Sequence, residues 1–389
     1  MLLRYVTLRR AKLSDPLRRL TQNGRQASPA RRFLEPLTCR PGKNAASLRR
    51  SVAKINVVLY TKPMASVKSQ QPPADPSSEP LAAGDTFVLA HLSDLHLGFP
   101  DGAGVREFLN KRVLGYLMWR FRRRAEYRPE VLEALIFDLR AARPDHIVVT
   151  GDLTHLGLPV EFRRAREWLH ALGPPSQVTI IPGNHDAYVR TAWGRPVAEW
   201  SDYMVSDGLS SPDPMVPLGL FPTVRIRGAF AVIGVCSARP SLPLLAVGSI
   251  GRAQLARLEK VLETTGRQDL FRVVLIHHPP VPGTVTWHRR LTDSAAFRAI
   301  LARQGAELVL HGHAHRTSVQ QIETPAGRVP VIGVPSASAA GRTAGRSSRY
   351  HLYHFRRDES GWDLRIAVRA YPFNEKISAD GALLNLFSS

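Results

Sequence analysis

Phe87-Val-Leu-Ala-His-Leu-Ser-Asp-Leu-His96 is an apolar run that ends in an Asp-x-His pair. Short apolar runs of this kind are typical of buried strands. Asp94 and His96 are two residues apart, so in extended chain their side chains point to one side. Alone, such a pair is more often a turn beside a surface histidine. Its interpretation therefore depends on the other motifs in the chain.

Four further segments repeat this arrangement, each after an apolar run. They are Gly151-Asp152, Gly183-Asn-His-Asp186, His277-His-Pro279 and Gly312-His-Ala-His315. Each alone has an ordinary explanation, since Gly-Asp is a common turn and a histidine at a strand end can be satisfied within a core. Together they place carboxylate, amide and imidazole groups at successive strand ends over about 220 residues. This mixed N/O set excludes a zinc–thiolate site and predicts a hydrolytic site with two metal ions.

Predicted strands and helices alternate from Phe87 onwards. The strands are Phe87–Leu92, His146–Thr150, Val178–Ile181, Ala231–Cys236, Arg272–Ile276 and Glu307–Leu310, and the helices are Pro129–Ala142, Val160–Leu172, Arg252–Leu262 and Ser294–Gln304. This alternation predicts an α/β fold in which two mixed β-sheets pack face to face with flanking helices. Four more strands come after these without helices, and we expect them to form an antiparallel extension on one sheet. They are Ser318–Glu323, Val329–Val334, Tyr350–Arg356 and Leu364–Ala370.

The formal net charge of +21 is concentrated near the N-terminus. Residues 1–63 hold 15 of the 53 Lys and Arg residues but only 2 of the 32 acids. The remaining domain is mildly basic, so no specific nucleic-acid partner is expected and a nuclease is disfavoured. We expect residues 1–63 to be a disordered extension: a stretch upstream of a true start at Met64, an organellar transit peptide, or an arm for anionic partners.

Domain boundaries are predicted from composition. We expect residues 64–84 to form a Pro/Ser-rich linker, residues 85–375 the catalytic domain, and residues 376–389 a C-terminal tail. Cys39 and Cys236 share no motif, which suits a reducing compartment. No apolar run approaches the ~20 residues needed to span a bilayer. These features favour a cytoplasmic protein, organellar only if the N-terminal segment is a transit peptide.

The ordered motifs resemble those of the calcineurin-like metallophosphoesterase superfamily, whose pattern is D-x-H, G-D, G-N-H-[DE], H and G-H-x-H. The resemblance spans roughly residues 86–316, and within it His91-Leu-Ser-Asp-Leu-His-Leu-Gly98 and His277-His-Pro-Pro280 look most like bacterial class III cyclic-nucleotide phosphodiesterases. It implies two metal sites that share one carboxylate: Asp94, His96, Asp152 and His315 at the first, and Asp152, Asn184, His277 and His313 at the second. It also implies that His185 acts on the phosphoryl group and that Asp186 orients His185. We interpret His278 as a residue that supports substrate binding from behind the ligands, not as a metal ligand.

The expected activity is hydrolysis of a small phosphodiester with two divalent ions, which could be Fe, Mn or Zn. Two such ions lower the pKa of a shared water and give hydroxide near neutral pH. His185 would stabilise phosphoryl charge or protonate the leaving group. Two alternatives stay open. One is a pyrophosphatase acting on phospholipids or nucleoside-diphosphate lipids at a membrane surface, and the other is a non-catalytic scaffold of the same fold, like the retromer subunit.

Residues 105–124 depart from the family pattern. Their apolar positions recur at helical spacing, and seven basic residues accompany a single acid, Glu107. One interpretation is a helix packed on the domain through its apolar stripe, with a solvated basic face. The other is a lid or interfacial helix that contacts an anionic membrane surface or a polyanionic substrate.

Overall fold

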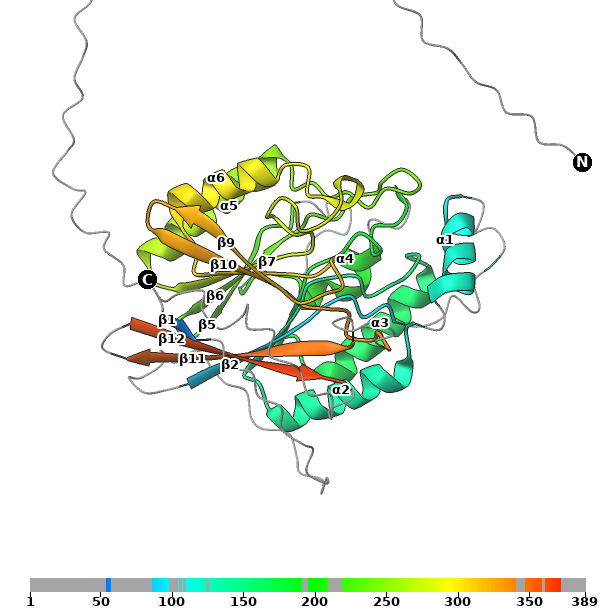
Figure 1. The fold of residues 1–389 in the computed structure, drawn as a ribbon, viewed down its shortest axis with the longest axis horizontal. Coiled ribbons are helices and arrows are strands. Elements are labelled where there is room, and N and C mark those ends of the chain that lie inside the picture. The colour runs from blue at the N-terminus through cyan, green and yellow to red at the C-terminus, as the bar shows by residue number, and fades with distance from the viewer. Residues whose placement is uncertain are drawn as a thin grey trace, which may run out of the picture. The chain divides into compact units, whose positions relative to one another are not determined.

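Two six-stranded β-sheets face each other in the domain (Figure 1). The structure is a computed structural model that describes residues 54–56, 86–97, 104, 107, 110–123, 126–190, 195–208, 219–340, 347–358 and 361–371. The strand orders are β1-β12-β11-β2-β3-β4 in the first sheet and β5-β6-β7-β8-β10-β9 in the second. With helices outside the sheets, this confirms the predicted fold class.

The two sheets and the helices are made of these segments. The first sheet contains β1 (Lys54–Asn56), β2 (Thr86–Leu92), β3 (His146–Val149), β4 (Val178–Ile180), β11 (Arg349–Asp358) and β12 (Gly361–Ala370). The second contains β5 (Thr223–Arg227), β6 (Phe230–Val235), β7 (Phe271–Ile276), β8 (Leu308–His311), β9 (Ser318–Thr324) and β10 (Gly327–Gly333). The α-helices are α1 (Arg112–Met118), α2 (Pro129–Ala142), α3 (Pro159–Leu172), α4 (Arg195–Trp200), α5 (Arg252–Arg267) and α6 (Ser294–Gln304).

The core lies between the sheets, with a second apolar layer under α5 and α6. Successive residues of β6 pack alternately into the core between the sheets and into the layer under α5 and α6, because neighbouring strand residues point to opposite faces. Phe230 belongs to the cluster between the sheets, and Ala231 and Ile233 to the cluster that includes α5 and α6. The rings of Phe87 and Phe230 stack with centroids 4.4 Å apart, which joins β2 of one sheet to β6 of the other. Burial on both faces explains the unbroken apolar run of β6.

The last four strands do not form one antiparallel extension, and that prediction is wrong. β9 and β10 pair with each other and extend the second sheet, where β10 runs parallel to β8. β11 and β12 instead join the first sheet, where β11 pairs with β2. The pairing partner of each hairpin is set by long-range packing, which local periodicity does not encode. β5 and α4 are also elements that the sequence did not predict.

Parallel strands bring their carboxyl ends to one edge of each sheet. β2, β3 and β4 run parallel in the first sheet, and β6, β7 and β8 in the second. The loops that carry the predicted motifs come directly after β2, β3, β4, β7 and β8. Ligand sites of α/β proteins lie at this edge, so the topology accounts for the position of the motifs.

In the described part of the predicted helix 105–124, the α-helix begins at Arg112 and its leucines are exposed. α1 spans Arg112–Met118, and a π-helical turn continues the chain to Arg123. Arg112 is buried and its Nε donates to the carbonyl oxygen of Leu156 at 2.9 Å. Leu117 and Phe121 are exposed instead. An apolar stripe packed against the domain therefore does not describe these residues.

Strand β1 lies inside the extension predicted over residues 1–63. It pairs in parallel with β12, with Lys54 opposite Asp363, so these three residues have structure where none was expected. The rest of 1–63, the linker 64–84 and the tail 376–389 lie outside the described residues, and the domain boundaries stay predictions. Among the described residues, no helix has the length and apolar content to cross a bilayer.

Candidate metal centre

Five of the predicted ligands occupy left-handed backbone. The φ angle is 53° at Asp94, 46° at His96, 57° at Asp152, 64° at His313 and 51° at His315. Only eight non-glycine residues in the described part of the chain have positive φ, so these five are most of them. This conformation is uncommon for residues with a Cβ and concentrates at functional sites. The loops after β2, β3 and β8 therefore present these side chains at a conformational cost.

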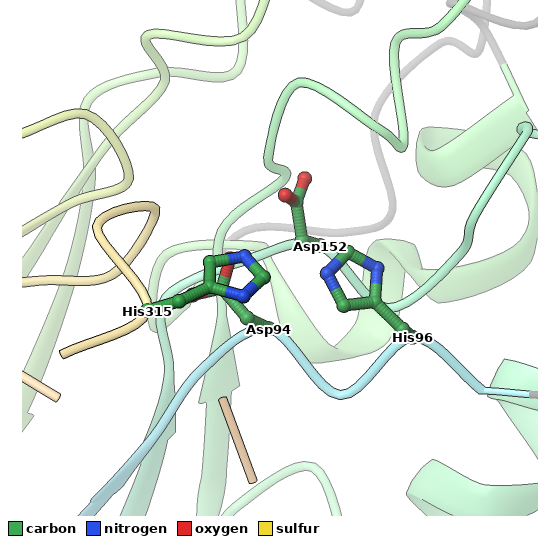
Figure 2. Close-up of side chains that lie close together, drawn as sticks. All are labelled: Asp94, His96, Asp152 and His315. Atoms are coloured by element: carbon green, nitrogen blue, oxygen red, sulfur yellow. The ribbon is translucent and has the colours of Figure 1, made fainter. Parts of the chain in front are cut away.

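Four of these side chains form a first group of candidate ligands, Asp94, His96, Asp152 and His315 (Figure 2). One ligand atom from each lies within 4.8 Å of the others. The Nε2 atom of His315 is 3.0 Å from Oδ1 of Asp94. Figure 2 shows the imidazoles of His315 and His96 to the left and right of the Asp152 carboxylate. Four ligand atoms this close together could hold one metal ion.

A second group shares Asp152 with the first. It consists of Asp152, His277 and His313, whose ligand atoms also lie within 4.8 Å of one another. Nε2 of His277 is 3.3 Å from Oδ2 of Asp152 and 3.1 Å from Oδ1 of Asn184. The predicted amide ligand thus lies beside this group. Asp152 stands between the two groups, where a carboxylate could bridge two cations.

Backbone carbonyls fix the orientation of His96 and His313, as the Thr150 carbonyl does for His277, whose Nδ1 lies 2.7 Å from it. Nδ1 of His96 lies 3.1 Å from the carbonyl oxygen of Thr154, and Nε2 of His313 lies 3.0 Å from that of Arg289. A carbonyl only accepts, so these nitrogens carry the proton and the other ring nitrogen keeps a lone pair. For His96 that nitrogen, Nε2, is buried without a hydrogen-bond partner. A buried lone pair opposite a tethered N–H is the usual arrangement of a metal-ligating histidine, so the residues fit a cation.

The electrostatics of the centre also favour a cation. Burial keeps the pKa values of His96 and His313 well below the usual range, so both rings are neutral. Burial would lower the pKa of His277 as well, but the charge and hydrogen bond of Asp152 overcome it and raise that pKa to about 9. Protonated His277 thus places beside Asp152 the positive charge that a metal ion would supply. Metal binding at such a site displaces that proton.

Gly312 allows the loop after β8 to approach Asp94. A Cβ at Gly312 would overlap Oγ of Ser93 and come within 2.5 Å of Oδ2 of Asp94. The next residue, His313, donates its backbone N–H to the same Oδ2 at 2.9 Å. The missing side chain is therefore required for the two ligand loops to meet.

Gly312→Ala is expected to lower the free energy of unfolding by about 1–3 kcal/mol, as overpacking does, and to weaken metal binding by displacing Asp94. Thermal unfolding with and without added Mn²⁺ measures both effects. Gly173→Ala is the matched control, because its Cβ would lie 3.3 Å from Cγ2 of Val178 and far from any ligand. If the two variants unfold at the same temperature, the close approach at Gly312 is not needed.

His185 lies at the cavity and belongs to neither ligand group. Its Nδ1 is 2.5 Å from the carbonyl oxygen of His155, and its backbone N–H donates to Oδ1 of Asp152 at 2.8 Å. The carbonyl holds Nδ1 in its protonated form.

Asp186 forms hydrogen bonds with backbone amides, and its role in orienting His185 stays a prediction. Its carboxylate accepts hydrogen bonds from the backbone N–H groups of Asp152 (2.9 Å), Thr154 (2.9 Å) and Gly183 (2.8 Å). It is a buried clamp that ties the loop after β3 to the loop after β4. Burial and the charge of Asp152 raise the pKa of Asp186 to about 7, and the backbone donors oppose that rise.

His278 contacts the segment that follows β6. Its Nδ1 is 2.8 Å from Oγ of Ser237 and its Nε2 is 3.2 Å from the carbonyl oxygen of Ala246. Both ring nitrogens are engaged and the side chain is fully buried. His278 therefore holds the 237–248 segment in place, and its role in substrate binding stays a prediction.

Three residues support the centre without having been predicted to do so. His155 supplies the carbonyl beside His185, Arg289 supplies the one beside His313, and the hydroxyl of Tyr127 is 3.4 Å from Nδ1 of His315. His155 lies three residues after Asp152, which was a signal in the sequence. Tyr127 and Arg289 lie outside every motif, so spacing could not have indicated them.

A cavity of about 280 Å³ opens over both groups. Its lining includes Asp152, Asn184, His185, His313 and His315. The other walls come from α1, the 241–246 loop, the turn around Arg289, and His155, Leu156 and Tyr188. A ligand in this cavity would touch the candidate metal ions and His185 together.

Comparisons with known proteins point to one family. A sequence model of calcineurin-like phosphoesterases matches residues 87–317. The chain is 28% identical over 243 residues to a "probable cyclic nucleotide phosphodiesterase" of Synechococcus sp., which covers 61% of this chain and 78% of that protein. It is 27% identical over 274 residues to a cAMP/cGMP dual specificity phosphodiesterase of Mycobacterium tuberculosis, covering 67% and 72%. A crystal structure of a dimetal phosphatase from Danio rerio aligns with a TM-score of 0.49 and 14% identity, covering 73% of this chain and 99% of that one.

Proposed function

The chain belongs to the calcineurin-like phosphoesterase family and is a metal-dependent phosphoric ester hydrolase, and we propose that it cleaves a small phosphodiester. The observation that carries this proposal is the sharing of Asp152 by two carboxylate–imidazole groups that meet at one cavity. The relatives' names make cyclic nucleotides the first substrate class to test. A cavity of about 280 Å³ is at the small end of ligand sites, which suits a compact diester.

We assign two divalent ions to the centre. Asp94, His96, Asp152 and His315 would hold the first, and Asp152, Asn184, His277 and His313 the second. The mixed carboxylate, amide and imidazole donors suit Fe, Mn or Zn. When bound, such ions supply Lewis-acid charge next to the phosphoryl oxygens and lower the pKa of water.

His185 is assigned the proton transfer. The carbonyl of His155 fixes the ring through Nδ1, so Nε2 can carry a proton toward the cavity. A protonated Nε2 stabilises charge on the phosphoryl oxygens and donates its proton to the leaving alkoxide oxygen. The bond from the His185 backbone to Asp152 keeps this donor beside the metal ligands.

Metal analysis and a substrate panel test the proposal. Purified protein, or protein loaded with Mn²⁺, is expected to contain about two ions per chain and to unfold at a higher temperature than protein treated with chelator. It is also expected to hydrolyse bis-p-nitrophenyl phosphate faster than the monoester p-nitrophenyl phosphate. A preference for the monoester would contradict the diester assignment. Protein that binds no metal and cleaves neither ester would instead be a scaffold of the same fold.

A further inference from the structure

Large apolar side chains are exposed around the mouth of the metal cavity. In the described part of the chain ten large hydrophobic residues are exposed, and eight of them lie on α1 with its π-helical turn, on the 241–246 loop and at the turn before Arg289. We call these eight the apolar rim: Val113, Leu114, Leu117, Met118, Phe121, Leu242, Leu244 and Trp287. Exposed apolar residues that gather in one place, rather than singly, mark a contact surface.

The rim surrounds the cavity itself. Leu114, Met118, Leu242 and Leu244 line the cavity as well as being exposed. Nζ of Lys111 donates to the carbonyl oxygen of Ser241 at 2.7 Å, which joins the start of α1 to the 241–246 loop. These parts of the rim are therefore two sides of one mouth.

The way α1 packs on the domain leaves its leucines exposed. The helix turns Gly115 and Arg112 inward, where a Cβ on Gly115 would collide with Tyr188 and Leu156. Arg112 is buried, and its Nε donates to the Leu156 carbonyl. Trp119 is buried just after the helix. A helix that buries an arginine and turns its leucines outward leaves apolar surface for a partner to cover.

The charge around the rim has one sign. Residues 110–123, 240–246 and 281–291 contain no Asp or Glu, and Lys111, Arg120 and Arg290 on these segments are not buried. Arg120 and Arg290 are exposed among the apolar side chains. Surfaces that combine apolar residues, a tryptophan and basic groups are those that bind at the interface of anionic bilayers.

We propose that the apolar rim docks the cavity mouth onto an anionic phospholipid bilayer. A protein partner seated on the same rim would close the mouth, whereas a bilayer presents phosphoester headgroups to it. The docking itself is independent of catalysis. Cleavage of a phosphodiester in a lipid headgroup by the docked enzyme is a further step, and it rests on the function proposed above.

Vesicle co-sedimentation tests the docking. Wild type is expected to bind vesicles of phosphatidylcholine with phosphatidylglycerol, to bind pure phosphatidylcholine more weakly, and to lose binding at high salt, where charge is screened. The triple variant Leu117→Gln, Phe121→Gln, Trp287→Gln removes exposed rim residues that do not line the cavity. It is expected to bind at least about tenfold more weakly, because three apolar side chains no longer insert.

The matched control is Phe137→Gln with Ile226→Gln, the other two exposed large hydrophobic residues, which lie on α2 and β5. It is expected to bind as wild type does. Equal loss in both variants would overturn the rim assignment, as would absence of wild-type binding to anionic vesicles. Equal binding to neutral and anionic vesicles would overturn the choice of an anionic surface.

Hydrolysis of soluble bis-p-nitrophenyl phosphate separates docking from catalysis. The triple variant is expected to keep the wild-type rate, which also shows that it folds. If the triple variant does not fold, the double variant Arg120→Gln, Arg290→Gln tests the docking instead. It is expected to lose only the salt-sensitive part of vesicle binding. Loss of vesicle binding with an intact rate supports docking. Vesicle binding by protein that cleaves no diester supports docking and counts against the proposed function.

Discussion

Asp152→Ala is expected to remove both metal ions and to lower diester hydrolysis by about 10³-fold or more, because the charge that stabilises the phosphoryl group is lost with them. Asp152 is the member that the two candidate ligand groups share. His315 and His277 each belong to one group only. His315→Ala and His277→Ala are therefore expected to lose about one ion each, and metal content per chain measures the difference.

The isosteric variant Asp152→Asn is the control for the fold. Asparagine keeps an oxygen that can accept the backbone N–H of His185, as Oδ1 of Asp152 does at 2.8 Å, but it removes the charge. It should preserve the unfolding temperature of metal-free protein better than alanine does, and still fail to hold two ions. Two ions retained by Asp152→Ala would show that the carboxylate does not bridge.

The motif positions could be predicted from sequence because each comes directly after a strand that is buried on both faces. Such strands contain unbroken apolar runs, as in β6 and residues 273–276 of β7, and polar residues directly after them are conspicuous. The order of the motifs then reflects the topology, since parallel strands deliver their ends to the same edge. The apolar pattern of the strands therefore predicts the position of the site, because the α/β fold class brings the ends of these strands together.

Roles that depend on contacts between distant loops could not be predicted in this way. Asp186 lies within a motif, yet its carboxylate satisfies backbone amides of Asp152 and Thr154, which belong to another loop. His278 sits next to a ligand, yet the 237–248 segment uses both of its nitrogens. Sequence spacing shows that such residues are near the centre. It does not show which partner each one takes.

The same limit applies to the fold. The hairpins β9–β10 and β11–β12 have similar local periodicity but join different sheets. On β5, Arg225 is buried where an alternating pattern would place an apolar residue, and its Nε donates to the Val205 carbonyl at 2.8 Å. Because a hydrogen-bonded arginine occupies this buried position, β5 lacks the apolar alternation by which a strand is predicted from sequence.

His185→Ala is expected to keep both metal ions and to lose turnover. The side chain belongs to neither ligand group, and alanine retains the backbone N–H that donates to Asp152. Loss of a positioned general acid typically slows a reaction by about 10²–10⁴-fold. Metal content and kcat measured on the same preparation separate the two effects. His170→Ala, a histidine replacement on an exposed part of α3, should leave both unchanged.

The leaving group distinguishes proton donation from simple charge stabilisation. p-Nitrophenolate leaves without help from an acid, whereas an alkoxide must be protonated, so general-acid catalysis matters most for the alkyl diester. The kcat of His185→Ala is therefore expected to fall much further on an alkyl diester that wild type cleaves than on bis-p-nitrophenyl phosphate. Equal losses on the two substrates would mean that His185 stabilises the phosphoryl oxygens only. If His185→Ala kept its metal ions and cleaved both substrates at the wild-type rate, His185 would take no part in the reaction. Its ring, held by the His155 carbonyl, would then only form part of the cavity wall.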